Sequence, residues 1–297
     1  MRNTIRSLFT AAALLGLGAY PVIAAAEAPM VKTQAPGYYR MMLGDFEVTA
    51  LSDGTAQLPM PKLLVSPRPA DVKQALERNF LVNDTVETSV NGYLINTGSK
   101  LVLIDTGAAG LFGPTLGNLL ANLRAAGYQP EQVDEIYITH MHADHVGGLM
   151  AGTSRAFPNA TLRIDRRDTE YWLSEANMNA APADAKGFFQ GAMASVNPYL
   201  AAGKLKPFDG RTELMPGIRS EPGYGHTPGH TIYVVESKGQ KLVLWGDVMH
   251  VAAVQFDYPA VTIQFDSDQP AAARERMRIY ADAARNGYLV GGAHIAF

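Results

Sequence analysis

Cysteine is absent from the 297 residues of this sequence, and its absence excludes three kinds of chemistry. The chain can form no disulfide framework, it has no thiol nucleophile, and it offers no thiolate to a metal ion. A transition-metal site in this protein must therefore be built from histidine and carboxylate side chains. The lack of cysteine is compatible with an oxidising compartment but does not require one.

A strong excess of charge of one sign is missing as well. Lysine and arginine total 25, aspartate and glutamate total 28, and the net charge is −3. A nucleic-acid-binding surface is therefore not indicated. With 47% hydrophobic and 18% charged residues, the composition is that of a globular domain.

The apolar run near the N-terminus, residues 8–19, is too short for a transmembrane helix. Arg2 and Arg6 precede it and small residues follow at 22–26, a pattern typical of a secretory signal peptide. We expect residues 1–26 to direct export to the periplasm and to be removed. The alternative is a disordered cytoplasmic tail. No cysteine follows the run, so we expect no lipid anchor and no membrane anchor.

Residues 27–297 are expected to form one domain, because no linker, low-complexity run or repeat divides them. The expected strands are 45–51, 89–97, 100–105, 135–139, 160–165, 231–236, 241–247 and 289–291. The expected helices are 70–80, 114–126, 168–176, 270–286, and 181–202 with breaks at Gly187, Gly191 and Pro198; residues 52–54 are an expected turn. Hairpins at 97–99 and 237–240 mean that the sheets are not purely parallel.

Three of the seven histidines fall within six residues, directly after the expected buried strand 135–139. They are His140, His142 and His145, and Asp144 lies among them. Imidazole nitrogen and carboxylate oxygen are the ligands that Zn²⁺ and similar cations prefer. His140 and His142 are two residues apart at the end of a strand, so they point the same way and can bind one ion. The alternative, a polar loop that happens to be rich in histidine, explains the spacing less well.

Further candidate ligands occur in the second half of the chain. His226 and His230 lie in a loop rich in glycine and proline, and from the residues alone either can bind. Asp247 follows an apolar strand, where an acid is either a turn residue or a bridge between two metals. His294 follows the last expected strand.

Together these motifs resemble those of the metallo-β-lactamase superfamily. The resemblance rests on His-x-His-x-Asp-His, a later Gly-His-Thr-Pro-Gly-His, a strand-end Gly-Asp and a late Gly-Ala-His, and it covers nearly the whole chain after residue 26. Within the superfamily, residues 39–54 and 245–250 are most similar to methyl parathion hydrolase and its lactonase-like relatives. The resemblance implies an α/β fold, an αββα sandwich of two mixed sheets flanked by helices.

The resemblance also implies two divalent metal ions per chain, zinc first, with cobalt, manganese or iron as alternatives. It assigns His140, His142 and His226 to one ion, Asp144, His145 and His294 to the other, and Asp247 to both. His230 would then orient other residues, and Asp105 would hold the histidine loop or serve as a plain turn cap. A pair of ions can share a hydroxide that attacks an ester at neutral pH.

Position 250 bears on the substrate. Many quorum-quenching lactonases of the superfamily have a tyrosine three residues after the bridging aspartate, where it helps to stabilise the oxyanion. Here the residue is His250, which favours the organophosphate hydrolase branch, although it can also be a histidine packed beside the site. The same resemblance implies a substrate pocket of Phe112, Trp172, Phe189 and His250, with Ile263 and Phe265 as weaker candidates. From the residues alone, Trp172 and Phe189 are core residues of their helices.

The sequence thus predicts a hydrolase of organophosphate triesters with lactonase and arylesterase side activities, in which Asp247 and His250 are catalytic. The alternative is an acyl-homoserine or aromatic lactone hydrolase. A β-lactamase, an iron-bearing redox enzyme and a structural zinc module rank lower. We expect a homodimer from the family likeness. The chain stops three residues after His294, so it is either short or completed at this site by a dimer partner.

Overall fold

The computed structural model describes residues 28–297, so the predicted signal peptide lies outside the described residues. The chain divides into two units, residues 1–35 and 36–297. Residues 28–35 contain neither helix nor strand, and every helix and strand of residues 28–297 lies in the second unit. Within residues 28–297, no helix is both long enough and apolar enough to cross a membrane.

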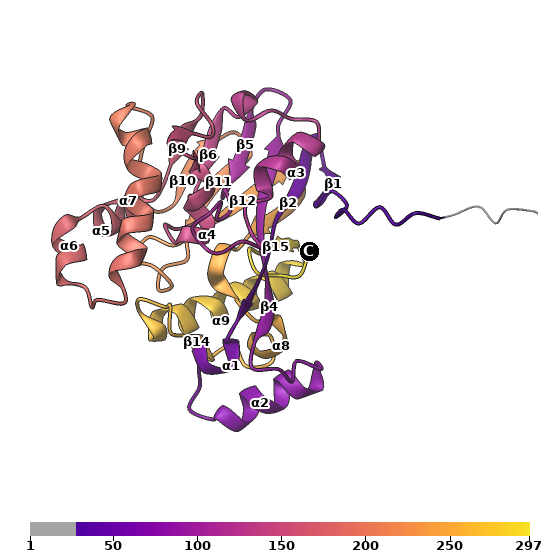
Figure 1. The fold of residues 1–297 in the computed structure, drawn as a ribbon, viewed down its shortest axis with the longest axis vertical. Coiled ribbons are helices and arrows are strands. Elements are labelled where there is room, and N and C mark those ends of the chain that lie inside the picture. Colours follow the sequence, from indigo (N-terminus) through magenta and orange to yellow (C-terminus); the bar gives the residue numbers. More distant parts are fainter. Residues whose placement is uncertain (1–27) are drawn as a thin grey trace, which may run out of the picture. The chain divides into compact units, whose positions relative to one another are not determined.

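The second unit is built on two mixed sheets (Figure 1). The first has the order β1 (Tyr38–Leu43), β2 (Phe46–Leu58), β4 (Val86–Asn96), β5 (Leu101–Ile104), β6 (Glu135–Tyr137) and β9 (Thr161–Arg163). The second has the order β10 (Thr212–Met215), β11 (Ile218–Pro222), β12 (Thr231–Ser237), β13 (Gln240–Leu244) and β15 (Leu289–Gly291). The neighbours β5–β6, β6–β9 and β13–β15 are parallel and the other pairs are antiparallel, which confirms the predicted mixed sheets.

Alternation along the strands explains the layers. In β12, Tyr233 and Val235 point to one face and pack with Val102 and Ile104 of the first sheet. Ile232 and Val234 point to the other face and pack under α9 (Gln269–Asn286). The outer face of the first sheet is covered by α3 (Leu119–Ala125), α5 (Arg166–Trp172) and α7 (Lys186–Ala201). The result is the predicted αββα sandwich.

Helix α9 shows how local signals set element boundaries. Its N-terminus is capped by Asp268, whose carboxylate accepts a hydrogen bond from Ala271 N at 2.9 Å, and proline occupies the first turn. It ends where Gly287 adopts a left-handed conformation with φ of 63°, which favours glycine.

Three predicted helices differ from the structure. The segment 114–126 becomes helical only at Leu119. The segment 168–176 is divided between α5 and α6 (Glu175–Ala180), because Ser174 caps a new helix start. The predicted breaks in 181–202 do not occur, and α7 is continuous from Lys186 to Ala201. Burial of Phe189, Val196 and Tyr199 along one face of α7 outweighs the poor helix propensity of its glycines and proline.

The predicted turn at 52–54 is also wrong. Strand β2 continues through it with a bulge between Ser52 and Gly54. Asp53 is buried there, and its carboxylate accepts hydrogen bonds from the backbone N–H groups of Ala108, Gly117 and Leu119. An Asp-Gly pair that resembles a turn therefore anchors a distant loop instead.

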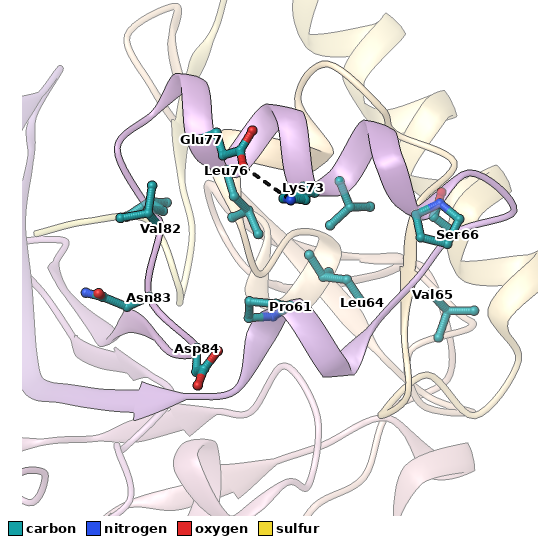
Figure 2. Close-up of a pocket in the computed structure, with 13 residues that line it drawn as sticks. Pro61, Leu64, Val65, Ser66, Lys73, Leu76, Glu77, Val82, Asn83 and Asp84 are labelled. Carbon is teal, nitrogen blue, oxygen red and sulfur yellow. Dashed lines mark ion pairs between the residues drawn. The ribbon is translucent and has the colours of Figure 1, made fainter.

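The segment 59–84, which we call the arm, leaves the first sheet between β2 and β4 and lies at the bottom of Figure 1. It contains α1 (Met60–Leu63), β3 (Leu64–Val65) and α2 (Pro69–Arg78), and β3 pairs with β14 (Thr262–Ile263). A surface cavity of about 410 Å³ lies beside α2, lined by side chains such as Leu64, Leu76 and Val82 (Figure 2). The arm shares one small hydrophobic core with α8 (Ala252–Gln255) and β14.

Candidate metal centre

The candidate ligands lie on loops that follow strands at one edge of the two sheets. The loop 139–146 follows β6 and includes the short helix α4 (Ala143–Val146). The loop 223–230 lies between β11 and β12, Asp247 and His250 follow β13, and His294 follows β15. Parallel neighbours such as β13 and β15 end at the same edge, and the structure brings all seven predicted ligands together there.

The first group consists of three histidines and one carboxylate. His140 Nε2 lies 3.0 Å from His142 Nδ1, and His226 Nε2 lies 3.2 and 3.1 Å from the same two atoms. Asp247 Oδ2 lies 3.3 Å from His226 Nε2 and 3.6 Å from His140 Nε2. Four ligands about 2.0 Å from a tetrahedral zinc ion are about 3.3 Å apart, so these spacings fit one ion.

The second group shares the same aspartate. Asp144 Oδ2 lies 3.6 Å from both His145 Nε2 and His294 Nε2. Asp247 Oδ1 is 3.2 Å from His145 Nε2, and Asp247 Oδ2 is 3.2 Å from His294 Nε2. The Asp247 carboxylate therefore lies between the two groups of side chains. His294 reaches this position from the same chain, so a dimer partner is not needed to supply it.

Buried atoms without hydrogen-bond partners test whether these residues fit a metal. Among residues 28–297, such atoms include His145 Nε2, Asp247 Oδ1 and both ring nitrogens of His250. Polar atoms buried in this way are costly unless a ligand or an ion satisfies them. The donor set contains only imidazole and carboxylate groups, which suits divalent cations such as zinc. The side chains therefore fit a dinuclear metal site.

The outer ring nitrogens of these histidines are held by other groups of the chain. His145 Nδ1 donates to Asp105 Oδ2 at 2.9 Å, and His294 Nδ1 donates to the Ser89 carbonyl oxygen at 2.7 Å. His226 Nδ1 donates to Asp266 Oδ1 at 2.8 Å. Partners of this kind fix the tautomer and the ring orientation of a ligand. Asp105 also accepts from the Thr139 N–H and hydroxyl, both at 2.8 Å, so it holds the histidine loop as the family resemblance implied.

His230 has a different position from the other histidines of the loops. Burial lowers its pKa to about 3, so the ring is neutral. Its Nδ1 donates to the Gly223 carbonyl at 3.0 Å, and its Nε2 accepts the Asp247 backbone N–H at 3.0 Å. Both nitrogens are therefore occupied, and the side chain holds the backbone of Asp247 in place.

Burial and the surrounding charges set the protonation of the centre. Burial lowers the pKa of His140 and of His142 well below the usual value, which keeps their ring nitrogens available as ligands. Burial alone raises the pKa of Asp247, but the positive charges of His294 and His145, whose own pKa values are raised, outweigh it and hold the Asp247 pKa well below its usual value. The residue between the two groups is therefore an anionic carboxylate.

His250 is fixed through its backbone. Its N–H donates to Gln255 Oε1 at 2.8 Å, and Gln255 Nε2 donates to the Val261 carbonyl at 2.9 Å. The ring stacks on His294 with centroids 5.3 Å apart, and its Nε2 lies 3.2 Å from Asp247 Oδ2. Neither ring nitrogen has an orienting partner, which distinguishes His250 from histidines such as His145 and His294.

Arg276 reinforces the same loop from α9. This buried guanidinium donates to the carbonyls of Val248, Pro259 and Val261 at 2.5, 3.0 and 2.6 Å. Burial lowers its pKa from the usual value. Since its hydrogen bonds go to the segment 248–261, Arg276 fixes the part of the chain that carries His250.

Replacing Arg276 should therefore destabilise the protein strongly. Arg276→Met keeps the length of the side chain but leaves the carbonyls of Val248 and Pro259 without this donor and the Val261 carbonyl with Gln255 alone. We expect the free energy of unfolding to fall by about 3 kcal/mol or more. The matched control is Arg278→Met on the same helix, where the side chain is 54% exposed and a loss below about 1 kcal/mol is expected. Urea unfolding measures both, and equal small losses would contradict this role for Arg276.

A cavity of about 480 Å³ opens beside the metal centre. Its lining includes His142 and the aromatic side chains of Tyr171, Trp172, Phe188, Phe189 and Phe265. The ring centroids of Trp172 and Phe188 lie 5.3 and 5.2 Å from that of His142. The cavity can therefore hold an apolar group next to the first set of ligand candidates.

Three residues predicted for the substrate pocket, Phe112, His250 and Ile263, are not part of this lining. Ile263 is fully buried in the core that the arm shares with α8 and β14. Phe112 packs on a small cluster of Ala56, Val90, Ala108 and Leu116. Sequence reasoning missed Phe188, which lies next to a predicted wall residue on α7, and also missed Asp266, whose contact with His226 spans 40 residues.

Known proteins share both the sequence pattern and the fold. A family model described as the metallo-beta-lactamase superfamily matches residues 85–284. An N-acyl homoserine lactonase from a Bacillus species is 25% identical over 205 residues, which cover 63% of this chain and 74% of that protein. The solved hydrolase AbOPH is 36% identical with a TM-score of 0.84, over 89% of this chain and 92% of that chain. The dizinc quorum-quenching lactonase AidC, solved with a homoserine product, is 26% identical with a TM-score of 0.79, over 88% of this chain and 91% of that chain.

Proposed function

This chain belongs to the metallo-beta-lactamase superfamily, and on that premise we propose that it is a dinuclear-metal hydrolase of small neutral esters, with lactones as its first substrates. One observation carries the proposal. The Asp247 carboxylate lies between two groups of buried imidazole and carboxylate side chains, with one oxygen 3.2 Å from His145 and the other 3.3 Å from His226.

In this proposal His140, His142 and His226 would hold one ion, Asp144, His145 and His294 would hold the other, and Asp247 would serve both. Such a pair of ions supplies a water of lowered pKa and an electrophile that polarises the ester oxygen. The residues of the chain provide the rest. Asp105 and Asp266 keep their histidines in the tautomer and orientation that leave the inner nitrogens free.

Asp247 and His250 are the proposed catalytic residues. Asp247 Oδ1 accepts no hydrogen bond from the chain, so it can orient the attacking water and carry a proton to the leaving alkoxide. His250 is held by its backbone while its ring nitrogens lack partners, so an N–H of this ring can donate to the oxygen that becomes negative during attack.

Lactones come first because the similar proteins include lactonases that act on N-acyl homoserine derivatives. The cavity beside His142 supports this choice, since its aromatic lining suits the apolar part of an acylated or aromatic lactone. Exclusion of water by the aromatic walls would also strengthen the electrostatic interactions at the ester.

Aryl phosphotriesters are the second candidate, in line with the methyl parathion hydrolase branch that the sequence resembles. Two observations favour them. Position 250 is a histidine instead of the tyrosine common in quorum-quenching lactonases, and Trp172, Phe188 and Phe189 form a wall against which an aryl leaving group can stack.

Zinc as the bound metal, a homodimer and export by residues 1–26 are further proposals.

A substrate panel tests the proposed function. Metal-replete protein should be compared by kcat/KM on an acyl-homoserine lactone, an aromatic lactone, a paraoxon-type triester and a cephalosporin. We expect the best lactone to exceed the cephalosporin by at least about 100-fold, a difference of about 3 kcal/mol in transition-state stabilisation. A dominant triester rate would favour the second candidate, and a dominant cephalosporin rate would overturn both.

A further inference from the structure

Asp168 of helix α5 contacts both loops that carry His140, His142 and His226, which we call the three-histidine group. The side chain is fully buried. Its Oδ2 accepts a hydrogen bond from the Met141 backbone N–H at 3.0 Å, and its Oδ1 accepts one from the Gly229 backbone N–H at 2.6 Å. The two contacts span 27 and 61 residues, so one carboxylate joins parts of the chain that are distant in sequence.

The two backbone positions are directly connected to candidate ligands. Met141 lies between His140 and His142, and Gly229 lies three residues after His226. A side chain at position 229 would force the loop or the helix to shift, because a Cβ there would lie 2.5 Å from the Asp168 backbone nitrogen. The loop 223–230 therefore packs directly against the first turn of α5.

We infer that Asp168 is a positioning residue that fixes the separation between the His140–His142 pair and His226. A backbone hydrogen bond from Thr231 N to the Thr139 carbonyl, 2.8 Å long, joins the same loops at their strand ends. Asp168 joins them again beyond the strands, in the loops that carry the three histidines. The three ring nitrogens lie about 3 Å from one another, so the affinity for an ion between them is sensitive to small displacements of one loop. The inference rests on the proposed two-metal site.

The same helix also places the aromatic wall. Trp172 follows Asp168 by four residues, one turn further along α5, and its ring lies edge-on to His142 with the planes at 71°. Movement of α5 would therefore change the cavity and the three-histidine group together. This arrangement makes α5 the element that connects substrate binding to metal binding.

Asp168→Asn tests the inference with little change of shape. An amide can accept from one of the two N–H groups, but its NH₂ then faces the other, so one loop contact is lost. We expect the three-histidine group to bind its ion about 10- to 100-fold more weakly, and the other group to change by no more than about twofold. Stepwise Zn²⁺ affinities from chelator competition, together with the absorption bands of the Co²⁺ form, measure the two groups separately.

Asp165→Asn is the matched control. Asp165 is equally buried and caps the same helix, but its carboxylate accepts from Arg167 N, Gly210 N and the Tyr224 hydroxyl. It therefore bonds to no backbone group of the two ligand loops, and it reaches the loop 223–230 only through the side chain of Tyr224. Gly229→Ala is a second test from the opposite side, because the added methyl group pushes the loop away from α5. It should weaken the same ion selectively, and it decides the question if Asp168→Asn does not fold.

The outcomes separate this inference from the proposed function. Wild-type protein that binds no divalent ion would overturn the proposed function. Wild-type protein with two ions, combined with unchanged affinities in Asp168→Asn and Gly229→Ala, would overturn only the positioning role. Equal losses in Asp168→Asn and Asp165→Asn would also overturn it, since they would reflect the stability of the helix and not the spacing of the loops.

Discussion

Asp247→Asn is expected to lower kcat/KM by on the order of 10³-fold or more, which corresponds to about 4 kcal/mol of transition-state stabilisation. The substitution removes the negative charge that lies between two groups of imidazoles. It also turns an amide NH₂ toward ring nitrogens that are 3.2 to 3.3 Å from the carboxylate in the native protein. We therefore expect metal analysis to give fewer than two ions per chain for this variant.

The exposed residue Asp209 provides the control for this experiment. Its carboxylate pairs with Arg166 at 2.8 Å, its side chain is 73% exposed, and Asp209→Asn should keep both the ions and the activity. Two ions and full activity in Asp247→Asn would show that this residue does not bridge the ions. Two ions with reduced activity would leave the ion-binding role to the histidines and confine Asp247 to proton transfer.

Removal of the metal ions should have the second large effect, and stability is the more informative readout. Ions present at about 1,000 times their dissociation constant stabilise the native state by about 4 kcal/mol. For a domain of this size, a chelator should therefore lower Tm by roughly 10 °C and abolish hydrolysis. The metal-free protein keeps buried atoms such as His145 Nε2 and Asp247 Oδ1 without any partner.

Readdition of Zn²⁺, Co²⁺ or Mn²⁺ should restore both Tm and activity, and the metal that restores most at equal occupancy is the preferred one. Asp247→Asn provides an internal comparison, since its Tm should respond less to the chelator. A Tm that is the same with and without chelator, in protein shown to contain two ions beforehand, would contradict the link between the ions and folding.

The candidate ligands could be found in the sequence more readily than the residues around them. His140, His142, Asp144 and His145 form a local motif, which can be recognised in the sequence without knowledge of the fold. His294 was assigned through the family resemblance, and the parallel pairing of β13 and β15 explains why it lies beside Asp247. The sandwich followed from the same resemblance and from strands whose apolar residues alternate or run continuously.

Residues that support the centre could not be found in this way. Asp168 and Asp266 act through hydrogen bonds to residues 27 to 61 positions away, and nothing near them in the sequence indicates those partners. Asp53 was placed in a turn because its neighbours are serine and glycine, whereas its three hydrogen bonds come from residues 55 to 66 positions later. Long-range backbone contacts of single carboxylates leave no periodic pattern.

The arm has a consequence for how this enzyme can diversify. The ligand loops are attached to the two sheets, but the loop with His250 rests on a core that residues such as Leu64 and Leu76 of the arm share with Val251 and Val254. Insertions and substitutions in the arm can therefore shift His250 while the strands that precede the candidate metal ligands stay unchanged. Variation in this peripheral module would then change the support of His250 and leave the other candidate ligand loops as they are.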